Sequence, residues 1–170
     1  MGRVEGPKRP VQYGSDRQRL TTTGRAVTVE EAAGADIVCT QTPSRTPVVA
    51  RAFIRPGAHI NAMGADAPGK QELDPRILLD GKVVIDDFEQ ATHSGEVNVP
   101  LHNGTLRVDH IAATLGTIVA GKKPGRTRDD EITIFDSTGL AVQDLALARA
   151  LYDRAQERGV GQMLDLVGSG

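Results

Sequence analysis

The chain has one cysteine, no long apolar run and almost no net charge. A single cysteine among 170 residues excludes an internal disulfide bond, and the apolar neighbours of Cys39 predict core packing rather than a nucleophile. No stretch approaches the roughly 18 apolar residues of a membrane span. The formal net charge of -2 argues against a nucleic-acid or membrane-surface partner. We therefore expect a soluble, cytoplasmic protein.

Metal-binding patterns are also missing. None of the histidines forms a short paired spacing with another metal-binding side chain on one helix face. The four positions are His59, His93, His102 and His110. We expect no metal ion.

Basic residues gather at the N-terminus. Residues 1–25 hold six basic and two acidic side chains, a net charge of +4, so the remainder carries -6. This segment is polar and aperiodic, which predicts a disordered leader over residues 1–26. It has no apolar h-region and therefore does not read as a secretory signal.

From residue 27 onward, strands alternate with helices. Short β-branched apolar runs predict strands over 36–40, 58–62, 82–85 and 132–135, and helical spacing or caps predict helices over 29–33, 74–79, 108–120 and 141–158. This order is typical of a parallel sheet with helices on both faces. The apolar stripe of 141–158 favours a core or subunit contact. We expect a sheet domain over 27–140, followed by a helix and tail over 141–170 that pack on the sheet or on another domain.

One loop, residues 61–73, carries most of the functional signal. It follows an apolar strand and holds a carboxylate, Asp66, which we expect to be buried, together with Lys70. Gly64 and Gly69 permit close backbone approach, and Pro68 stiffens the turn. A charge pair at the carboxyl end of a strand is typical of a ligand site in an open sheet. The alternative is a surface turn whose charges are merely solvated.

Polar residues follow two other strands in the same way. Segments 40–42 and 136–139 lie where their strands end, and adjacent parallel strands end at one edge of a sheet. Caps and turns would also explain these residues, with Asp136 capping the last helix region. Asp66 could orient an ammonium group or a water, or take its proton, while Lys70 could hold an anion or pair with an acid.

Five motifs in unbroken order resemble the ornithine cyclodeaminase family, which includes archaeal alanine dehydrogenases and μ-crystallin. They are TQTPSRTP at 40–47, NAMGADAPGKQELD at 61–74, VIDD at 84–87, GEVNVP at 95–100 and FDSTGLAVQD at 135–144. The resemblance covers about residues 27–161 and only the carboxyl-terminal half of such a protein. It implies an α/β fold with a partial Rossmann-like sheet, flanking helices and a long C-terminal helix.

The resemblance also implies roles for individual residues. Asp66 would be the catalytic carboxylate that faces the substrate. Contacts to the cofactor, NAD with NADP as the alternative, would come from Thr42, Ala62, Met63, Gly64, Ala65, Lys70 and Ser137. Such an enzyme removes a hydride from the Cα of a small amino acid, forms an imine and releases ammonia, and a full-length member would be a homodimer.

Two family features are absent from the sequence. No Gly-x-Gly-x-x-Gly fingerprint opens a strand–helix turn, and the upstream arginine and lysine that grip the substrate carboxylate are missing. We therefore expect a truncated half that is inactive alone. One alternative is a non-catalytic NAD(P)-binding protein of the μ-crystallin type. Another is an unstable product whose sheet edge stays unpaired.

Overall fold

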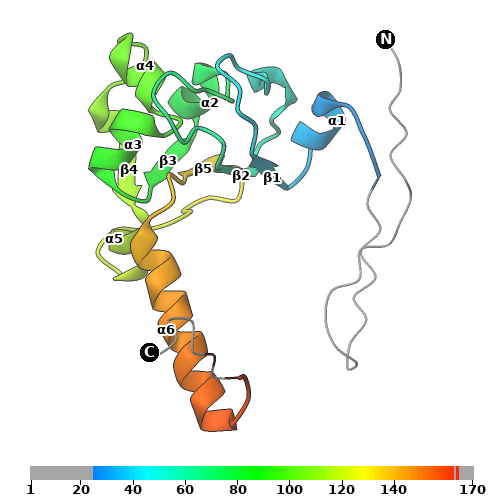
Figure 1. The fold of residues 1–170 in the computed structure, drawn as a ribbon. Coiled ribbons are helices and arrows are strands. Elements are labelled where there is room, and N and C mark those ends of the chain that lie inside the picture. The colour runs from blue at the N-terminus through cyan, green and yellow to red at the C-terminus, as the bar shows by residue number, and fades with distance from the viewer. Residues whose placement is uncertain (1–24, 163, 165–170) are drawn as a thin grey trace.

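Five parallel strands form one sheet in a computed structural model that describes residues 25–162 and 164. The strands are β1 (Ile37–Thr40), β2 (His59–Ala62), β3 (Lys82–Ile85), β4 (Ile111–Thr114) and β5 (Thr133–Asp136). Their spatial order is β1-β2-β5-β3-β4 (Figure 1). Because all neighbours run parallel, their carboxyl ends lie on the same edge of the sheet.

Eight helical segments precede, connect or follow these strands. They are α1 (Val29–Ala33), η1 (Arg51–Phe53), α2 (Pro75–Asp80), α3 (Phe88–Ser94), α4 (Asn98–His102), η2 (Val108–His110), α5 (Leu115–Val119) and α6 (Ala141–Arg158) within the described residues. The sequence predicts α1 and α2 well because their caps are local. Thr28 accepts a hydrogen bond from the Glu31 amide, and Asp74 accepts one from the Arg76 amide. The α/β class is confirmed.

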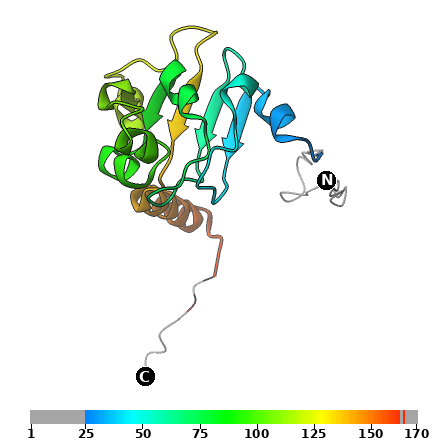
Figure 2. The same cartoon turned by 90° about the horizontal axis from the view of Figure 1, so that it is seen from above.

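The core lies between the sheet and α2, α3 and α4, which Figures 1 and 2 show on one side of it. Ile60, Ile77, Ile85 and Ile134 are fully buried there, and burying each such side chain contributes about 1.5 to 3 kcal/mol. The other side carries α5 and α6 (Figure 1). It is only partly covered, since Ile37 of β1 is 65% exposed.

Two sequence predictions about the fold are wrong, and one alternative explanation is excluded. The helix predicted over 108–120 is instead η2, β4 and α5, because its apolar run also fits a short strand. Cys39, predicted to be in the core, is exposed because β1 buries only alternate residues. Asp136 does not cap α6, whose N-cap is Leu140 and has no side-chain cap bond.

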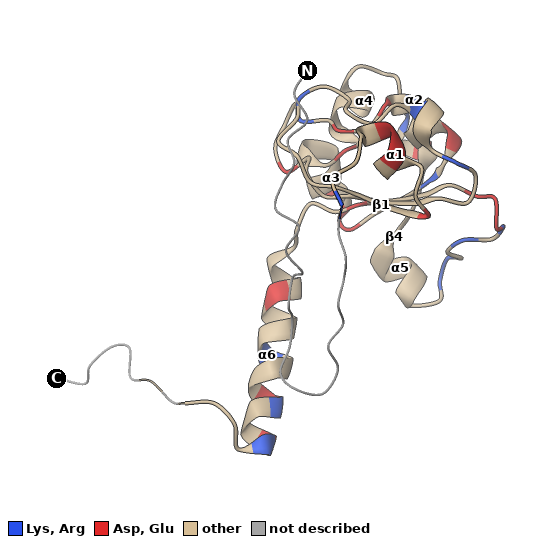
Figure 3. Ribbon diagram, turned by 90° about the vertical axis from the view of Figure 1, so that its right-hand side faces the viewer, with Lys and Arg blue, Asp and Glu red and all other residues tan. Residues whose placement is uncertain are grey.

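The helix α6 runs away from the sheet (Figures 1 and 3). None of its residues is buried, and its apolar stripe, including Val142, Leu145 and Leu151, faces solvent. Packing on another domain remains a prediction for this helix. The leader predicted over 1–26 falls almost wholly outside the described residues. No helix in the described part of the chain is long and apolar enough to cross a membrane.

Candidate functional site

Three of the predicted segments meet at the carboxyl edge of the sheet. Thr40, Ala62 and Asp136 are in register at the ends of β1, β2 and β5. Past these ends, the Met63 amide donates to the Thr40 carbonyl and the Ser137 amide donates to the Ala62 carbonyl, both at 3.0 Å. The loops that carry the proposed contact residues therefore lie side by side. We call this edge the rim, defined by residues 40–42, 61–73 and 136–139.

Small residues let the rim loops approach one another closely. A Cβ added to Gly64 would lie 2.4 Å from the Thr42 carbonyl oxygen and 2.5 Å from the Thr42 nitrogen. Gly69 has φ of +78°, a conformation that L side chains rarely adopt, and its amide donates to Asn98 Oδ1 at 3.1 Å. Glycine is therefore required at position 64 by close contacts and at position 69 by the backbone conformation.

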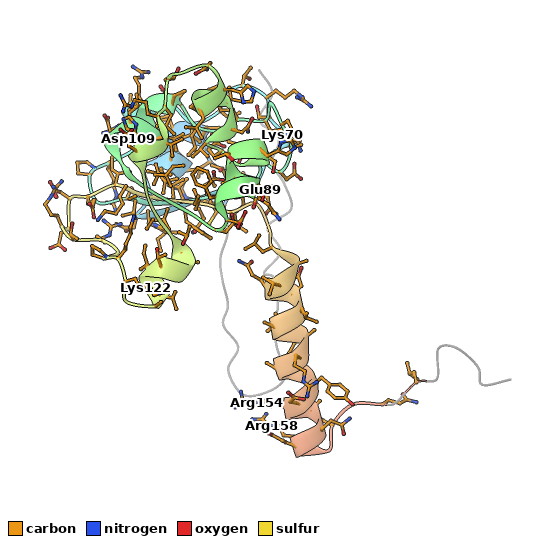
Figure 4. All side chains as sticks on the ribbon, turned by 90° about the vertical axis from the view of Figure 1, so that its left-hand side faces the viewer. Lys70, Glu89, Asp109, Lys122, Arg154 and Arg158 are labelled. Carbon is orange, nitrogen blue, oxygen red and sulfur yellow. The ribbon has the colours of Figure 1, made fainter. Side chains whose placement is uncertain are left out.

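Asp66 and Lys70 form an ion pair on this loop. Lys70 Nζ donates to Asp66 Oδ1, and this contact lowers the pKa of the Asp66 carboxyl below its usual value. The expectation of a buried Asp66 is wrong, since its side chain is 64% exposed, whereas that of Lys70 is 19% exposed. Figure 4 shows Lys70 at the surface of the sheet domain. An ionised, accessible carboxylate can orient an ammonium group or a water.

Three buried carboxylates, two within the rim and one behind it, have a role that the sequence analysis missed. Glu72 accepts hydrogen bonds from the Thr42 amide at 2.5 Å and from the Gly64 amide at 2.9 Å. Glu96 accepts from the Glu72 amide at 3.0 Å and from the Leu73 amide at 2.7 Å. Asp136 accepts from the amides of Glu96 at 2.9 Å and Val97 at 3.1 Å. Asp136 thus holds the backbone of Glu96, and Glu96 holds the backbone of Glu72. We call these three hydrogen-bonded carboxylates the relay.

Burial shifts the pKa of two relay members upward. It raises the pKa of Glu96 to about 8, against an opposing effect of the backbone amides that Glu96 accepts. It raises the pKa of Asp136 to about 7, again opposed by the amides, with the Asp86 charge adding to the rise. Asp86 in turn accepts from the Thr138 amide at 2.6 Å and the Gly139 amide at 3.2 Å. Carboxyl groups of Glu72 and Asp86 therefore hold the rim loops in place through hydrogen bonds to their backbone amides.

The sequence contains a weak signal for this relay. Glu72 and Glu96 each precede an apolar residue that is buried with them, Leu73 and Val97. Acidic residues are rarely buried, so the default interpretation is a solvated face. Apart from the Gly64 amide, eight residues from Glu72, the donors lie 23 to 40 residues away from their acceptors along the chain, which hides these pairings from any local pattern.

Cavities lie on one face of the sheet and at both ends of its strands, the one on the face having about 600 Å³ and a lining that includes Ile37, Leu115 and Phe135. A cavity of about 550 Å³ borders the rim loop and is lined by Pro68, Gly69, His93 and Asn98, among others. A cavity of about 480 Å³ lies at the other end of the strands, beside Lys82. No group of three or more histidine, cysteine, aspartate or glutamate side chains that could hold a metal ion occurs within the described residues.

Comparisons with known proteins agree with the fold and the motifs. Alanine dehydrogenase from Archaeoglobus fulgidus is 48% identical over 162 residues, 95% of this chain and 49% of that protein. Delta(1)-pyrroline-2-carboxylate reductase from Bacillus cereus is 41% identical over 133 residues, 77% of this chain and 41% of that protein. The chain thus spans about half the length of the curated relatives it matches.

Solved structures give the same result. An archaeal alanine dehydrogenase dimer with bound NAD superposes with a TM-score of 0.75 at 51% identity, covering 81% of this chain and 43% of that chain. The Thermococcus litoralis Delta(1)-pyrroline-2-carboxylate reductase, in complex with NADH and L-proline, gives a TM-score of 0.73 at 39% identity, covering 80% of this chain and 42% of that chain.

A family model extends the resemblance towards the N-terminus. The model for the ornithine cyclodeaminase/mu-crystallin family matches residues 17–159, so the similarity begins ten residues before the position expected from the motifs. The family similarity thus includes residues 17–26, which belong to the predicted leader. With this match and these relatives, the chain belongs to the ornithine cyclodeaminase/mu-crystallin family.

Proposed function

We propose that this chain forms the NAD-facing part of an enzyme that moves a hydride between the cofactor and the Cα of a small amino acid or its imine. The observation that carries this proposal is the meeting of the three loops at the rim. Thr42, residues 62–65 and Ser137 come from adjacent parallel strands whose ends are in register. Ligands of open α/β sheets bind at this edge. Relatives named as dehydrogenases and reductases support the reaction class.

The rim residues fit the nicotinamide end of such a cofactor. Ala62, Gly64 and Ala65 are small and buried, Met63 between them is 45% exposed, and the hydroxyl-bearing Thr42 and Ser137 follow the two neighbouring strands. Thr40 Oγ1 is buried at the same end of β1 and has no hydrogen-bond partner among the described residues. Hydroxyls and small residues suit a flat ring that carries a carboxamide and a ribose. When bound, NAD supplies the acceptor for the hydride, and NADH supplies the donor.

Asp66 acts on the substrate in this proposal. Its lowered pKa keeps it ionised at neutral pH, so it accepts hydrogen bonds more readily than protons. It would orient the substrate ammonium group, or the water or side-chain amine that attacks the imine before ammonia leaves. Lys70 holds the carboxylate in its charged form. The two residues therefore act as one unit.

The first prediction is that the chain binds NADH with a dissociation constant below about 1 mM. The sequence has no tryptophan, so NADH fluorescence can be followed without interference from the protein. Titration of the chain with NADH and NADPH measures both affinities. Failure of both cofactors to bind would contradict the proposal.

A second candidate function is binding of NAD(P) without catalysis, as expected for a μ-crystallin type protein. The family match covers this possibility equally. Incubation with NAD and L-alanine or L-ornithine, followed through NADH absorbance and ammonia release, tests this candidate. Turnover of either amino acid would exclude the non-catalytic alternative.

The second prediction concerns the ion pair. Lys70→Met is expected to raise the pKa of Asp66 towards 3.8, its ordinary value, because the neighbouring positive charge and its hydrogen bond are removed. Carbon-13 NMR titration of the Asp66 carboxyl measures the shift. Lys122→Met, on an exposed loop beyond α5 (Figure 4), is the matched control and should leave this pKa unchanged. An equal effect of both substitutions would show that the pair has no local role.

A further inference from the structure

Glu72 holds two separate loops of the rim together. Its side chain is fully buried, and no lysine or arginine of the described residues forms a salt bridge with it. Its two oxygens accept the Thr42 amide, after β1, and the Gly64 amide, after β2. Burying a carboxylate is costly unless backbone donors compensate for the lost water. Simple packing would be served better by an apolar residue.

The position of Glu72 is fixed from three directions. Its amide donates to Glu96, and its carbonyl accepts from the Val48 amide at 2.7 Å and the Val49 amide at 3.0 Å. The close fit continues at Gly64, where an added Cβ would lie 2.5 Å from Glu72 Cδ. The carboxylate therefore cannot shift without moving the loops that it joins.

The support reaches across the sheet to β5. Asp136 holds the amides of Glu96 and Val97, and Asn98 of the same segment donates from Nδ2 to the Lys70 carbonyl at 3.2 Å. Segment 95–98, which leads from α3 into the first residue of α4, thus contacts residues 69–73 of the loop that carries Asp66. Such a network fixes a site geometry more closely than exposed loops can.

We propose that Glu72 is a positioning residue that sets the spacing between the Thr42 and Gly64 backbones for the cofactor, with Glu96 and Asp136 holding it in place. This inference rests on the proposed function, because the two loops are those assigned to the nicotinamide end of NAD. Glu72 itself does not touch the ligand. Its carboxylate already accepts the Thr42 and Gly64 amides, so the cofactor would contact the side chains and the other backbone groups of these loops.

The third prediction tests this role with Glu72→Gln. Glutamine keeps one acceptor oxygen but places its NH2 group against the other backbone amide. Two donors then face each other, so one of the two loops loses its hydrogen bond to residue 72. We expect NADH affinity of the folded protein to fall about ten-fold. In the ligand-free protein, nitrogen-15 NMR should show changed shifts and faster exchange for the Thr42 or Gly64 amide.

Two controls separate positioning from stability and charge. Ile77→Val, at a buried position of α2, should lower stability with no change in the NADH affinity of the folded fraction. Glu89→Gln removes an exposed charge on α3 (Figure 4) and should change neither quantity. If Glu72→Gln binds NADH as tightly as the unsubstituted chain, the positioning role is overturned. If the unsubstituted chain does not bind NADH, the proposed function fails, and the cofactor role of Glu72 fails with it, whatever the amide exchange shows.

Discussion

Gly64→Ala is expected to lower the free energy of unfolding by about 3 kcal/mol, as overpacking does in a site with no room. The new methyl group would meet the Thr42 backbone at 2.4 and 2.5 Å, and the Glu72 carboxyl carbon at 2.5 Å. Backbone on one side and a fixed carboxylate on the other cannot move aside. Urea denaturation, followed by circular dichroism, measures the change. The same variant should bind NADH more weakly in its folded fraction, since both rim loops are displaced.

Gly116→Ala is the matched control for this substitution. Gly116 lies in α5, and nothing in the structure comes within 4 Å of a Cβ added there. Alanine gains up to about 1 kcal/mol over glycine in a helix. The two glycine substitutions should therefore move stability in opposite directions. Equal stability of Gly64→Ala and the unsubstituted chain would show that the rim loops are not packed as closely as the structure indicates.

The rim could be predicted from the sequence, whereas its support could not. Strand ends of a parallel sheet share an edge, so locating β1, β2 and β5 was enough to bring Thr42, Gly64 and Ser137 together. Cap and glycine signals are local, and they gave α2 close to its observed bounds. The exposed Cys39 could not be predicted, because the exposure of an edge strand depends on what covers it.

The buried acids were missed for a different physical reason. Glu72, Glu96 and Asp136 are compensated by backbone amides from other parts of the chain, not by a lysine or arginine that a sequence pattern would pair with them. Backbone amides are present at every residue except proline and so leave no sequence signal. Asp66 was wrongly expected to be buried because the sequence of a short glycine-rich loop says little about the exposure of its side chains.

Stability is expected to fall by up to about 6 kcal/mol between about pH 5 and about pH 8. The folded pKa values of Glu96 and Asp136 are raised to about 8 and about 7, above the ordinary 4.5 and 3.8. The folded protein therefore keeps protons that the unfolded chain has already lost. This contribution is fully present below the unfolded pKa values and is lost as pH rises through the folded ones. The main cause is burial, and the neighbouring acids are Glu72 and Asp86.

Glu96→Gln assigns this slope to one residue. Glutamine resembles the protonated carboxyl and keeps an oxygen where Glu96 Oε1 accepts the Glu72 and Leu73 amides. The variant should lose up to about 1.4 kcal/mol per pH unit of the decline, which is the contribution of one proton. Urea denaturation at several pH values measures both slopes, with Glu89→Gln as the exposed control. A variant that is strongly destabilised at low pH, or an unsubstituted chain with no slope, would mean that the backbone amides keep Glu96 ionised.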